Sequence, residues 1–129
     1  MLVSTKGRYA LRVMIELATH EEGEYVQTAQ NISEKYLESI IGVLSKAGLL
    51  DGLRGKGGGY RLNRSAKDYS VGEILRLTEG TLAPVSCLEG DENTCERCTD
   101  CKTLPMWENL NRLISSYLDG VSIDDLKNN

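Results

Sequence analysis

The stretch KAGLLDGLRGKGGGYRL, residues 46–62, decides how this chain folds. Gly48 can adopt the left-handed backbone conformation that ends many helices, so we expect a helix to stop there. Two apolar runs follow, Leu49–Leu53 and Gly59–Leu62, and the segment between them is rich in glycine. Because glycine accepts positive φ angles in tight turns, the pattern predicts a β-hairpin with a slim tip.

Two amphipathic helices are predicted before this hairpin. The first spans about Lys6–Thr19, with Ser4 and Thr5 as candidate N-caps. The second follows Ser33 and ends before Gly48. Its apolar residues recur at helical spacing, namely Leu37, Ile40, Ile41, Leu44 and Ala47. A helix, a short link, a second helix and a basic hairpin follow one another in the order of a winged helix-turn-helix.

In that fold the second helix enters the major groove of DNA, and the hairpin lies along phosphates or in the minor groove. The polar residues near the start of the predicted recognition helix are Ser33, Glu34, Lys35, Glu38 and Ser39. Arg54 and Lys56 lie at the hairpin tip. Each pattern alone also fits an ordinary surface helix or a charged β-turn, but their order favours nucleic-acid binding. A nucleotide loop is disfavoured, because no Gly-Lys-Ser/Thr sequence and no helix follow the glycines.

The charge of the chain is divided unevenly. Residues 1–67 contain ten Lys and Arg against seven Asp and Glu, and residues 68–129 contain five against twelve. The net charges of +3 and −7 make up the −4 of the chain. The basic residues between positions 46 and 67 are Lys46, Arg54, Lys56, Arg61, Arg64 and Lys67. Such a patch predicts a surface that faces a polyanion, although a solvated basic surface fits it equally well when it is taken alone.

The C-terminal half is predicted to hold two more helices. Ser70 is placed to cap a short helix over Val71–Glu79, and residues 81–103 look irregular. Pro105 fits the first turn of a last helix that reaches about Asp119. Apolar residues there alternate in steps of three and four, a heptad seam suited to pairing with a second helix: Trp107, Leu110, Ile114, Tyr117 and Val121.

All four cysteines lie in the irregular segment, as Cys87-x7-Cys95-x2-Cys98-x2-Cys101. Thiolates at such spacing reach one metal centre in zinc and iron–sulfur sites, so the segment predicts a zinc ion or a cluster. Neighbouring acids raise thiolate pKa values, so a bound metal has to keep these thiols deprotonated. A disulfide or free thiols are the alternatives, and a disulfide is disfavoured in a reducing cytosol.

Composition narrows the class of protein. The 129 residues suffice for one domain, or for a small domain with an extension. No run approaches the ~20 apolar residues of a membrane span. Arg12 and Glu16 interrupt the apolar run nearest the N-terminus, so we expect no signal peptide, no membrane partner and a cytoplasmic location. A small iron–sulfur redox carrier or enzyme is the competing class, but it offers no purpose for the basic hairpin.

Several segments carry a family resemblance over nearly the whole chain. They are STKGRYAL (residues 4–11), ISEKYLE (32–38), KAGL (46–49), RGKGGGY (54–60), VGEI (71–74), LTEG (77–80), and Cys101 followed by PMW (105–107). Together they resemble the Rrf-type winged-helix transcriptional regulators, which include the iron–sulfur regulator IscR, the nitric-oxide sensor NsrR and the cysteine-metabolism repressor CymR.

The resemblance implies a mainly α fold with a small β-hairpin wing, in which residues 1–67 bind DNA and residues 68–129 form a cysteine loop and dimerisation region. It implies a homodimer, paired through the last helix, on a near-palindromic operator in double-stranded DNA. By position, Lys35, Tyr36, Glu38 and Ser39 face bases or phosphates. Lys6 and Arg8 contact phosphates, and Arg54 and Lys56 serve the wing.

The resemblance also implies a cofactor. IscR-like members hold a [2Fe-2S] cluster with three cysteines and a histidine three residues after the last, where this chain has Leu104. Ligation by Cys87, Cys95, Cys98 and Cys101 is therefore our hypothesis, with cluster type open and zinc or thiol redox as alternatives. NsrR-like members use an aspartate from the N-terminal segment, where this chain has Arg8. Genes of iron–sulfur assembly or cysteine metabolism are the implied targets.

One segment is shorter than the resemblance predicts. Family members have about five more residues between Val26 and Ile32, where they form the first helix of the helix-turn-helix. Residues 27–31 suffice for little more than one turn, at ~3.6 residues per turn. A recognition helix without that support would be poorly held, so we expect that residues are missing from this segment.

Overall fold

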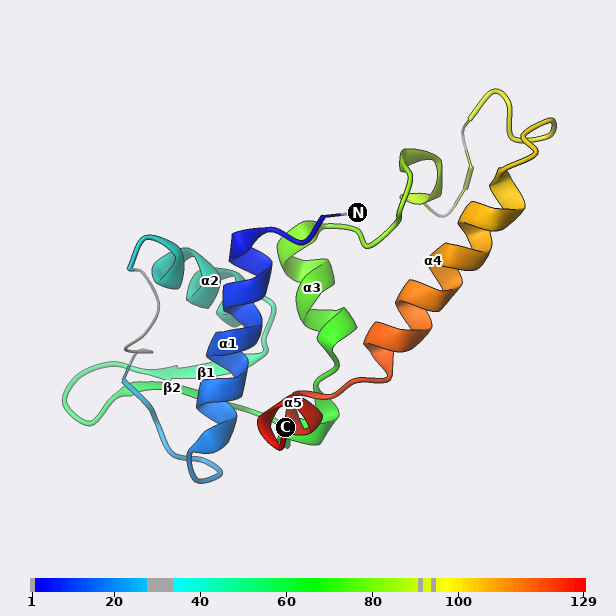
Figure 1. The fold of residues 1–129 in the computed structure, drawn as a ribbon. Helices are drawn as coiled ribbons and strands as arrows, with labels where there is room; N and C mark the ends of the chain where they lie inside the picture. The colour runs from blue at the N-terminus through cyan, green and yellow to red at the C-terminus, as the bar shows by residue number, and fades with distance from the viewer. Residues whose placement is uncertain (1, 28–33, 91, 94) are drawn as a thin grey trace.

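The computed structural model describes residues 2–27, 34–90, 92–93 and 95–129, and for residues 34 and 35 the backbone only. Two long helices, two strands and a short helix come first, followed by the C-terminal elements (Figure 1). Their bounds are α1 Thr5–Thr19, α2 Glu34–Lys46, β1 Leu50–Leu53, β2 Gly59–Leu62, η1 Ala66–Asp68, α3 Val71–Glu79, η2 Ser86–Leu88, α4 Leu104–Asp119 and α5 Ile123–Lys127.

Helix α1 is the centre of the fold. It packs against α2, α3, α5 and the second strand of the hairpin, while α4 contacts α3 and extends outward from this body (Figure 1). Ala10 and Met14 are fully buried in α1, where they meet Ile40 and Leu44 of α2. The side chain of Ser4 caps α1 by accepting a hydrogen bond from the Gly7 amide at 3.0 Å. The predicted helix-on-helix core is therefore present.

The hairpin forms as predicted, and a third segment extends it. Strands β1 and β2 are antiparallel, with Leu50 opposite Leu62 and Leu53 opposite Gly59. Val26 makes an isolated bridge to Tyr60, with hydrogen bonds of 2.8 and 2.9 Å between their backbones. Gly59 has φ +145°, and a Cβ there would collide with the Val26 carbonyl. Glycine is thus required where the link from α1 crosses the wing.

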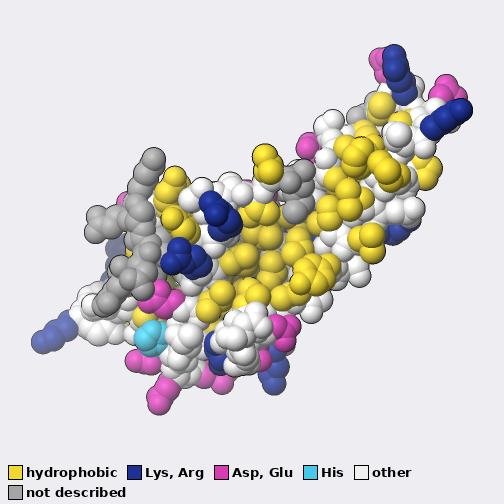
Figure 2. Space-filling view, in the orientation of Figure 1, with side chains coloured by type: hydrophobic (Ala, Val, Ile, Leu, Met, Phe, Trp, Pro, Cys, Tyr) yellow, Lys and Arg dark blue, Asp and Glu magenta, His cyan; other side chains and the backbone are white. Residues whose placement is uncertain are grey.

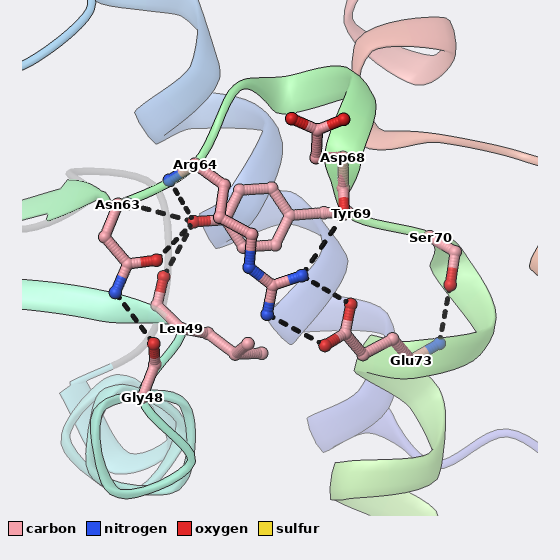
Figure 3. A network of polar contacts seen from close by, with 8 residues as sticks. All are labelled: Gly48, Leu49, Asn63, Arg64, Asp68, Tyr69, Ser70 and Glu73. Carbon is pink, nitrogen blue, oxygen red and sulfur yellow. Dashed lines mark hydrogen bonds and ion pairs between the residues drawn. The ribbon is translucent and has the colours of Figure 1, made fainter.

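A buried tyrosine ties the wing to both flanking helices (Figure 3). Tyr69, fully buried, donates a hydrogen bond from its hydroxyl to the Leu49 carbonyl at 2.8 Å. The same oxygen accepts from the amides of Asn63 at 2.9 Å and Arg64 at 3.1 Å. Burial raises the pKa of Tyr69, although the two backbone donors act in the opposite direction. The Tyr69 hydroxyl oxygen therefore connects three parts of the chain: the end of α2, the base of the hairpin and the start of α3.

An ion pair lies beside this hydroxyl. The Arg64 guanidinium stacks 4.6 Å from the centre of the Tyr69 ring and makes two bonds, of 2.9 and 3.1 Å, to the Glu73 carboxylate (Figure 3). Glu73 belongs to the first turn of α3, which Ser70 caps through the Glu73 amide at 3.0 Å. The Ser70 cap is confirmed, and it positions the acid that receives Arg64.

The C-terminal end corrects one prediction and adds a helix. Val121 was predicted to continue the heptad seam, but α4 ends at Asp119, and the Val121 carbonyl instead accepts the Val71 amide at 2.8 Å. Helix α5 was not predicted, although a capping box between Ser122 and Asp125 marks its start. Ile123 of α5 is fully buried against the α1 core. The chain therefore returns to the central helix after α4.

Within the described residues, no helix is long and apolar enough to cross a membrane. His20 is exposed at the end of α1, with its Nδ1 3.6 Å from the Glu24 carboxylate.

Replacing Tyr69 by Phe is expected to lower the free energy of unfolding by about 1–3 kcal/mol, because three backbone groups, among them the buried Leu49 carbonyl, lose a partner. Equilibrium urea denaturation measures the loss. Tyr25→Phe is the matched control, since it keeps the ring that stacks on Arg61, and within the described residues the Tyr25 hydroxyl makes no hydrogen bond. Equal stability of wild type and Tyr69→Phe would contradict the role assigned to this hydroxyl.

The same pair of proteins gives a pH dependence. An unfolded tyrosine ionises near pH 10, and the folded pKa of Tyr69 lies higher. The contribution of its hydroxyl is therefore complete below about pH 10 and is lost as the pH rises through the folded pKa. The stability difference between wild type and Tyr69→Phe should narrow in that alkaline range.

Candidate nucleic-acid interface and cysteine loop

The outward face of α2 carries the candidate base-contacting residues that the structure describes. Leu37, Ile40, Ile41 and Leu44 turn inward, which leaves Glu38 and Ser39 exposed. Tyr36 is half-buried, with its ring 5.5 Å from that of Tyr9 in an edge-to-face contact. Tyr36 thus joins α2 to α1 while it lies near the predicted DNA-facing side. Ser33 lies outside the described residues, as do the Lys35 side chain and most of the short segment after Val26.

The wing tip is a glycine turn that presents two cations. Gly55 and Gly57 have φ angles of +94° and +80°, and the Gly58 amide donates to the Gly55 carbonyl at 3.1 Å. Arg54 and Lys56 are exposed on this turn. Neither forms an ion pair with any residue that the structure describes. The tip is narrow, and both of its cations are available to an anionic partner.

Two members of the predicted basic patch, Arg61 and Arg64, form contacts within the fold. Arg61 bonds to Asp51 at 3.4 Å and to the Gly23 carbonyl at 3.0 Å, and it stacks 4.4 Å from the centre of the Tyr25 ring. Arg64 is held by Glu73, as described above. Their charges stabilise the base of the wing, so the prediction of one patch from Lys46 to Lys67 was too broad.

A third group of cations lies at the start of α1. Lys6 is half-buried and Arg8 is exposed, one on each side of Gly7. One Arg8 guanidinium nitrogen donates to the Thr5 hydroxyl at 3.2 Å. The two side chains project from the same helical end that Ser4 caps.

A groove separates α2 from the hairpin. It encloses about 990 Å³, and its described lining includes Leu37 and Ile41 from α2 and Leu53 and Tyr60 from the hairpin. The groove leaves parts of α2 and of the hairpin uncovered by each other, although α2 and β1 also contact one another.

The four cysteines lie on the connection between α3 and α4. Cys87 is on η2, whereas Cys95, Cys98 and Cys101 precede α4. Among the described residues, no three Cys, His, Asp or Glu side chains are close enough together to hold a metal ion. The chemistry of the donor set fits a metal, since four thiolates suit zinc or an iron–sulfur cluster. Ligation by all four requires the segment to bring these cysteines closer together than they lie here.

Cys101 has the most distinctive surroundings of the four. Its Sγ lies 3.3 Å from the Thr103 hydroxyl. The side chain of Thr103, followed by the backbone amides of Thr103 and Leu104, lowers the pKa of Cys101. The start of α4 therefore favours the thiolate, the form that binds metals.

Helix α4 leaves one apolar face uncovered. No residue of α4 is fully buried, and Met106, Leu110, Leu113 and Tyr117 are 52%, 37%, 68% and 72% exposed. Figure 2 shows apolar side chains along this helix and on into the body of the molecule. Ile114, predicted in the same seam, instead packs beside Val71 and Leu75 of α3. The exposed stripe consists of Met106, Leu110, Leu113 and Tyr117, which are four, three and four positions apart. Of these, only Leu110 and Tyr117 belong to the predicted seam.

This fold is a winged helix-turn-helix, and the class that it defines is that of DNA-binding proteins. The comparison with family models agrees, since the model "Rrf2: Iron-dependent Transcriptional regulator" matches residues 3–129. The chain belongs to the Rrf2 family of transcriptional regulators and is not an enzyme.

Individual relatives lie on two branches of this family. The chain is 37% identical to the regulator IscR of Aliivibrio salmonicida, over 98% of this chain and 77% of that protein. It is equally 37% identical to the regulator CymR of Bacillus subtilis, over 98% and 89%. Sequence similarity therefore does not favour either branch.

Solved structures give the same picture. The structure of B. subtilis CymR, described as the global cysteine regulator, is 36% identical and has a TM-score of 0.75, over 99% of this chain and 97% of that one. The structure of T. potens IscR is also 36% identical, with a TM-score of 0.72, over 98% and 85%. The predicted fold, mainly α with a hairpin wing, is confirmed.

Proposed function

We propose that this protein is a homodimeric DNA-binding regulator whose affinity for its operator depends on an iron–sulfur cluster held by its four cysteines. One observation carries the proposal. The cysteine segment, residues 80–103, joins α3 to α4. Glu73 of α3 and Tyr69 just before it hold the base of the wing, and α4 carries an uncovered apolar face. Closing that segment around a cluster changes how α3, beside the wing, is connected to α4, through which the protomers pair.

The DNA contacts of the proposal use three groups of residues. The recognition helix contributes Ser33, Lys35, Tyr36, Glu38 and Ser39, which face base edges and nearby phosphates. Arg54 and Lys56 on the glycine turn contact the phosphates beside the groove, where their exposed charges displace counterions. Lys6 and Arg8 contact a further phosphate. Each protomer covers one half-site, so the two half-sites lie about one helical turn of DNA apart, or a multiple of it.

The dimer forms through α4. Its stripe of exposed apolar residues has the heptad spacing with which helices pair, and Trp107 lies half-buried beside it. Pairing two copies of the stripe removes large side chains from water, which is the usual driving force for such association. Of the predicted interface residues, Leu110 and Tyr117 lie on the stripe, whereas Ile114 and Val121 pack within their own chain.

The cluster is held by Cys87, Cys95, Cys98 and Cys101. Four thiolates suit [2Fe-2S] and [4Fe-4S] clusters alike, and [2Fe-2S] is the type that the resemblance to IscR-like members implies. It supplies a charged centre that can be lost or oxidised, and its loss frees the segment between α3 and α4. Iron–sulfur assembly and cysteine-metabolism genes are the targets suggested by the IscR and CymR relatives. Zinc, or a thiol redox site without a cluster, is the second candidate, because the donor set serves it equally.

Anaerobic addition of ferrous iron and sulfide is expected to give a brown protein with visible absorption. Cys98→Ser should lose most of that absorption, because one of four ligands is removed. Thr99→Ala, a neighbour without a thiol, is the control and should keep it. A protein that stays colourless and binds stoichiometric zinc would replace the cluster by the second candidate.

Arg54→Ala and Lys56→Ala are each expected to reduce the slope of log affinity against log salt by about 1, since each removes about one phosphate contact. Fluorescence anisotropy with a random-sequence duplex between 50 and 200 mM salt measures the slope. Lys67→Ala removes an exposed cation on η1, at the opposite end of the hairpin, and should leave the slope unchanged. An unchanged slope in both wing variants would refute the wing contacts.

Leu113→Asp is expected to weaken dimerisation by about 2 kcal/mol or more, roughly 30-fold in Kd, because a charge enters the pairing stripe. Sedimentation equilibrium measures the change. Arg112→Asp places the same acid one residue away, off the stripe, and should remain dimeric. Dimers that survive Leu113→Asp would locate the interface elsewhere.

A further inference from the structure

Two segments that carry the family resemblance contain residues, Ser4 and Glu79, to which the proposed function gives no role, and the structure brings them together. Residues 4–11 form the start of α1, and residues 77–80 form the end of α3. The Ser4 amide donates to Glu79 Oε1 at 2.5 Å, and the Ser4 hydroxyl donates to Glu79 Oε2 at 2.8 Å. The Glu79 carboxylate therefore accepts hydrogen bonds from both donors of Ser4, the residue that caps α1.

The contact is tight enough to exclude a side chain on the facing helix. A Cβ on Gly7 would lie 2.5 Å from Glu79 Oε1 and 3.1 Å from Thr78 Oγ1. Gly7 is buried in a helix where its φ is ordinary. Its small size thus serves the approach of α3 rather than a special backbone conformation. The carboxylate also lies at the positive end of the α1 dipole, where a negative charge is stabilised.

On the α3 side, this contact adjoins the cysteine segment. Glu79 is the last residue of α3, and Gly80, with φ +81°, turns the chain into that segment. Leu82 is 4% exposed and packs with Val71 and Leu75 of α3, and Val3 lies against the same cluster. The beginning of the cysteine segment is thus packed against the residues that precede α1.

On the α1 side, the contact adjoins the cations proposed to bind phosphate. Lys6 and Arg8 flank Gly7. Their backbone positions are set by the first turn of α1, which is held by Ser4 on one side and Glu79 on the other. A movement of Glu79 therefore shifts the first turn of α1, and with it the backbone positions of Lys6 and Arg8. The residues of the hydrophobic core need not move.

We propose that Glu79 is a positioning residue that transmits the state of the cysteine segment to the DNA-contacting end of α1. The inference rests on the proposed function, because it needs a segment whose state changes DNA affinity. When the segment is closed, Glu79 holds Ser4 and orients Lys6 and Arg8. When the segment is released, the end of α3 moves with it and that orientation is lost.

Two substitutions break the contact from opposite sides. Glu79→Ala removes the carboxylate and weakens the capped end of α1. Gly7→Ala inserts a methyl group that displaces the carboxylate, while alanine favours the helix more than glycine does. The two variants thus shift helix stability in opposite directions but share the loss of the contact. Ser122→Ala is the control, because it removes an equivalent cap, from α5 instead of α1.

The measured quantity is the ratio of DNA affinities with and without ferrous iron and sulfide, on a duplex selected by the wild-type protein from a random library. In Glu79→Ala and in Gly7→Ala this ratio is expected to fall to within about twofold of one. Ser122→Ala should keep the wild-type ratio. Hydrogen exchange at the amides of residues 5–8 gives a second readout, which should respond to iron and sulfide in the wild type and not in the two variants.

The outcomes separate the two proposals. A wild-type ratio that persists in both variants, with exchange at residues 5–8 still responsive, overturns the role of Glu79 and leaves the proposed function standing. A wild type that binds DNA with the same affinity in both states overturns cluster sensing, and the inference with it. A loss in Glu79→Ala alone, with Gly7→Ala unaffected, shows a stability effect and also overturns the inference.

Discussion

The hydroxyl of Tyr69 is the constraint on which the arrangement of the DNA-contacting elements depends. It lies in a fully buried position where the end of α2, the base of the wing and the start of α3 meet. A buried hydroxyl is tolerated only when its hydrogen bonds are made, so the three elements must adopt the geometry that supplies its partners. The angle between recognition helix and wing follows from that requirement.

Helix α3 connects the two ends of the molecule because it is anchored at both of its own ends. Its first turn holds Arg64 through Glu73, and its last residue, Glu79, holds Ser4. Between them, Arg76 pairs with Asp119 at the end of α4. A short, rigid helix with these attachments relates the wing, the start of α1 and the pairing helix to one another. The cysteine segment begins directly after the last turn of α3, so a change in that segment acts on α3 at this turn.

The charge pattern has two structural meanings that composition cannot separate. Arg54 and Lys56 project from a turn whose glycines hold it clear of the body, so their charges face solvent. Arg61 and Arg64 are equally basic and only a few residues away, but carboxylates and aromatic rings of the fold engage them. The first pair is the one that we propose contacts DNA, and the second pair stabilises the base of the wing.

Local chemistry in the sequence was sufficient for the helices, the hairpin, the Ser4 and Ser70 caps and the grouping of the cysteines, because periodicity, glycine turns and caps act over a few residues. Helix α5 was within reach as well, through Ser122 and Asp125, but five residues are too few for a periodic pattern. Only the tertiary structure decided which face of α4 stays uncovered, where Val121 packs, and that Glu79 meets Ser4, 75 residues away. Those outcomes depend on which surfaces meet after collapse, and spacing along the chain carries no information about partners so far apart.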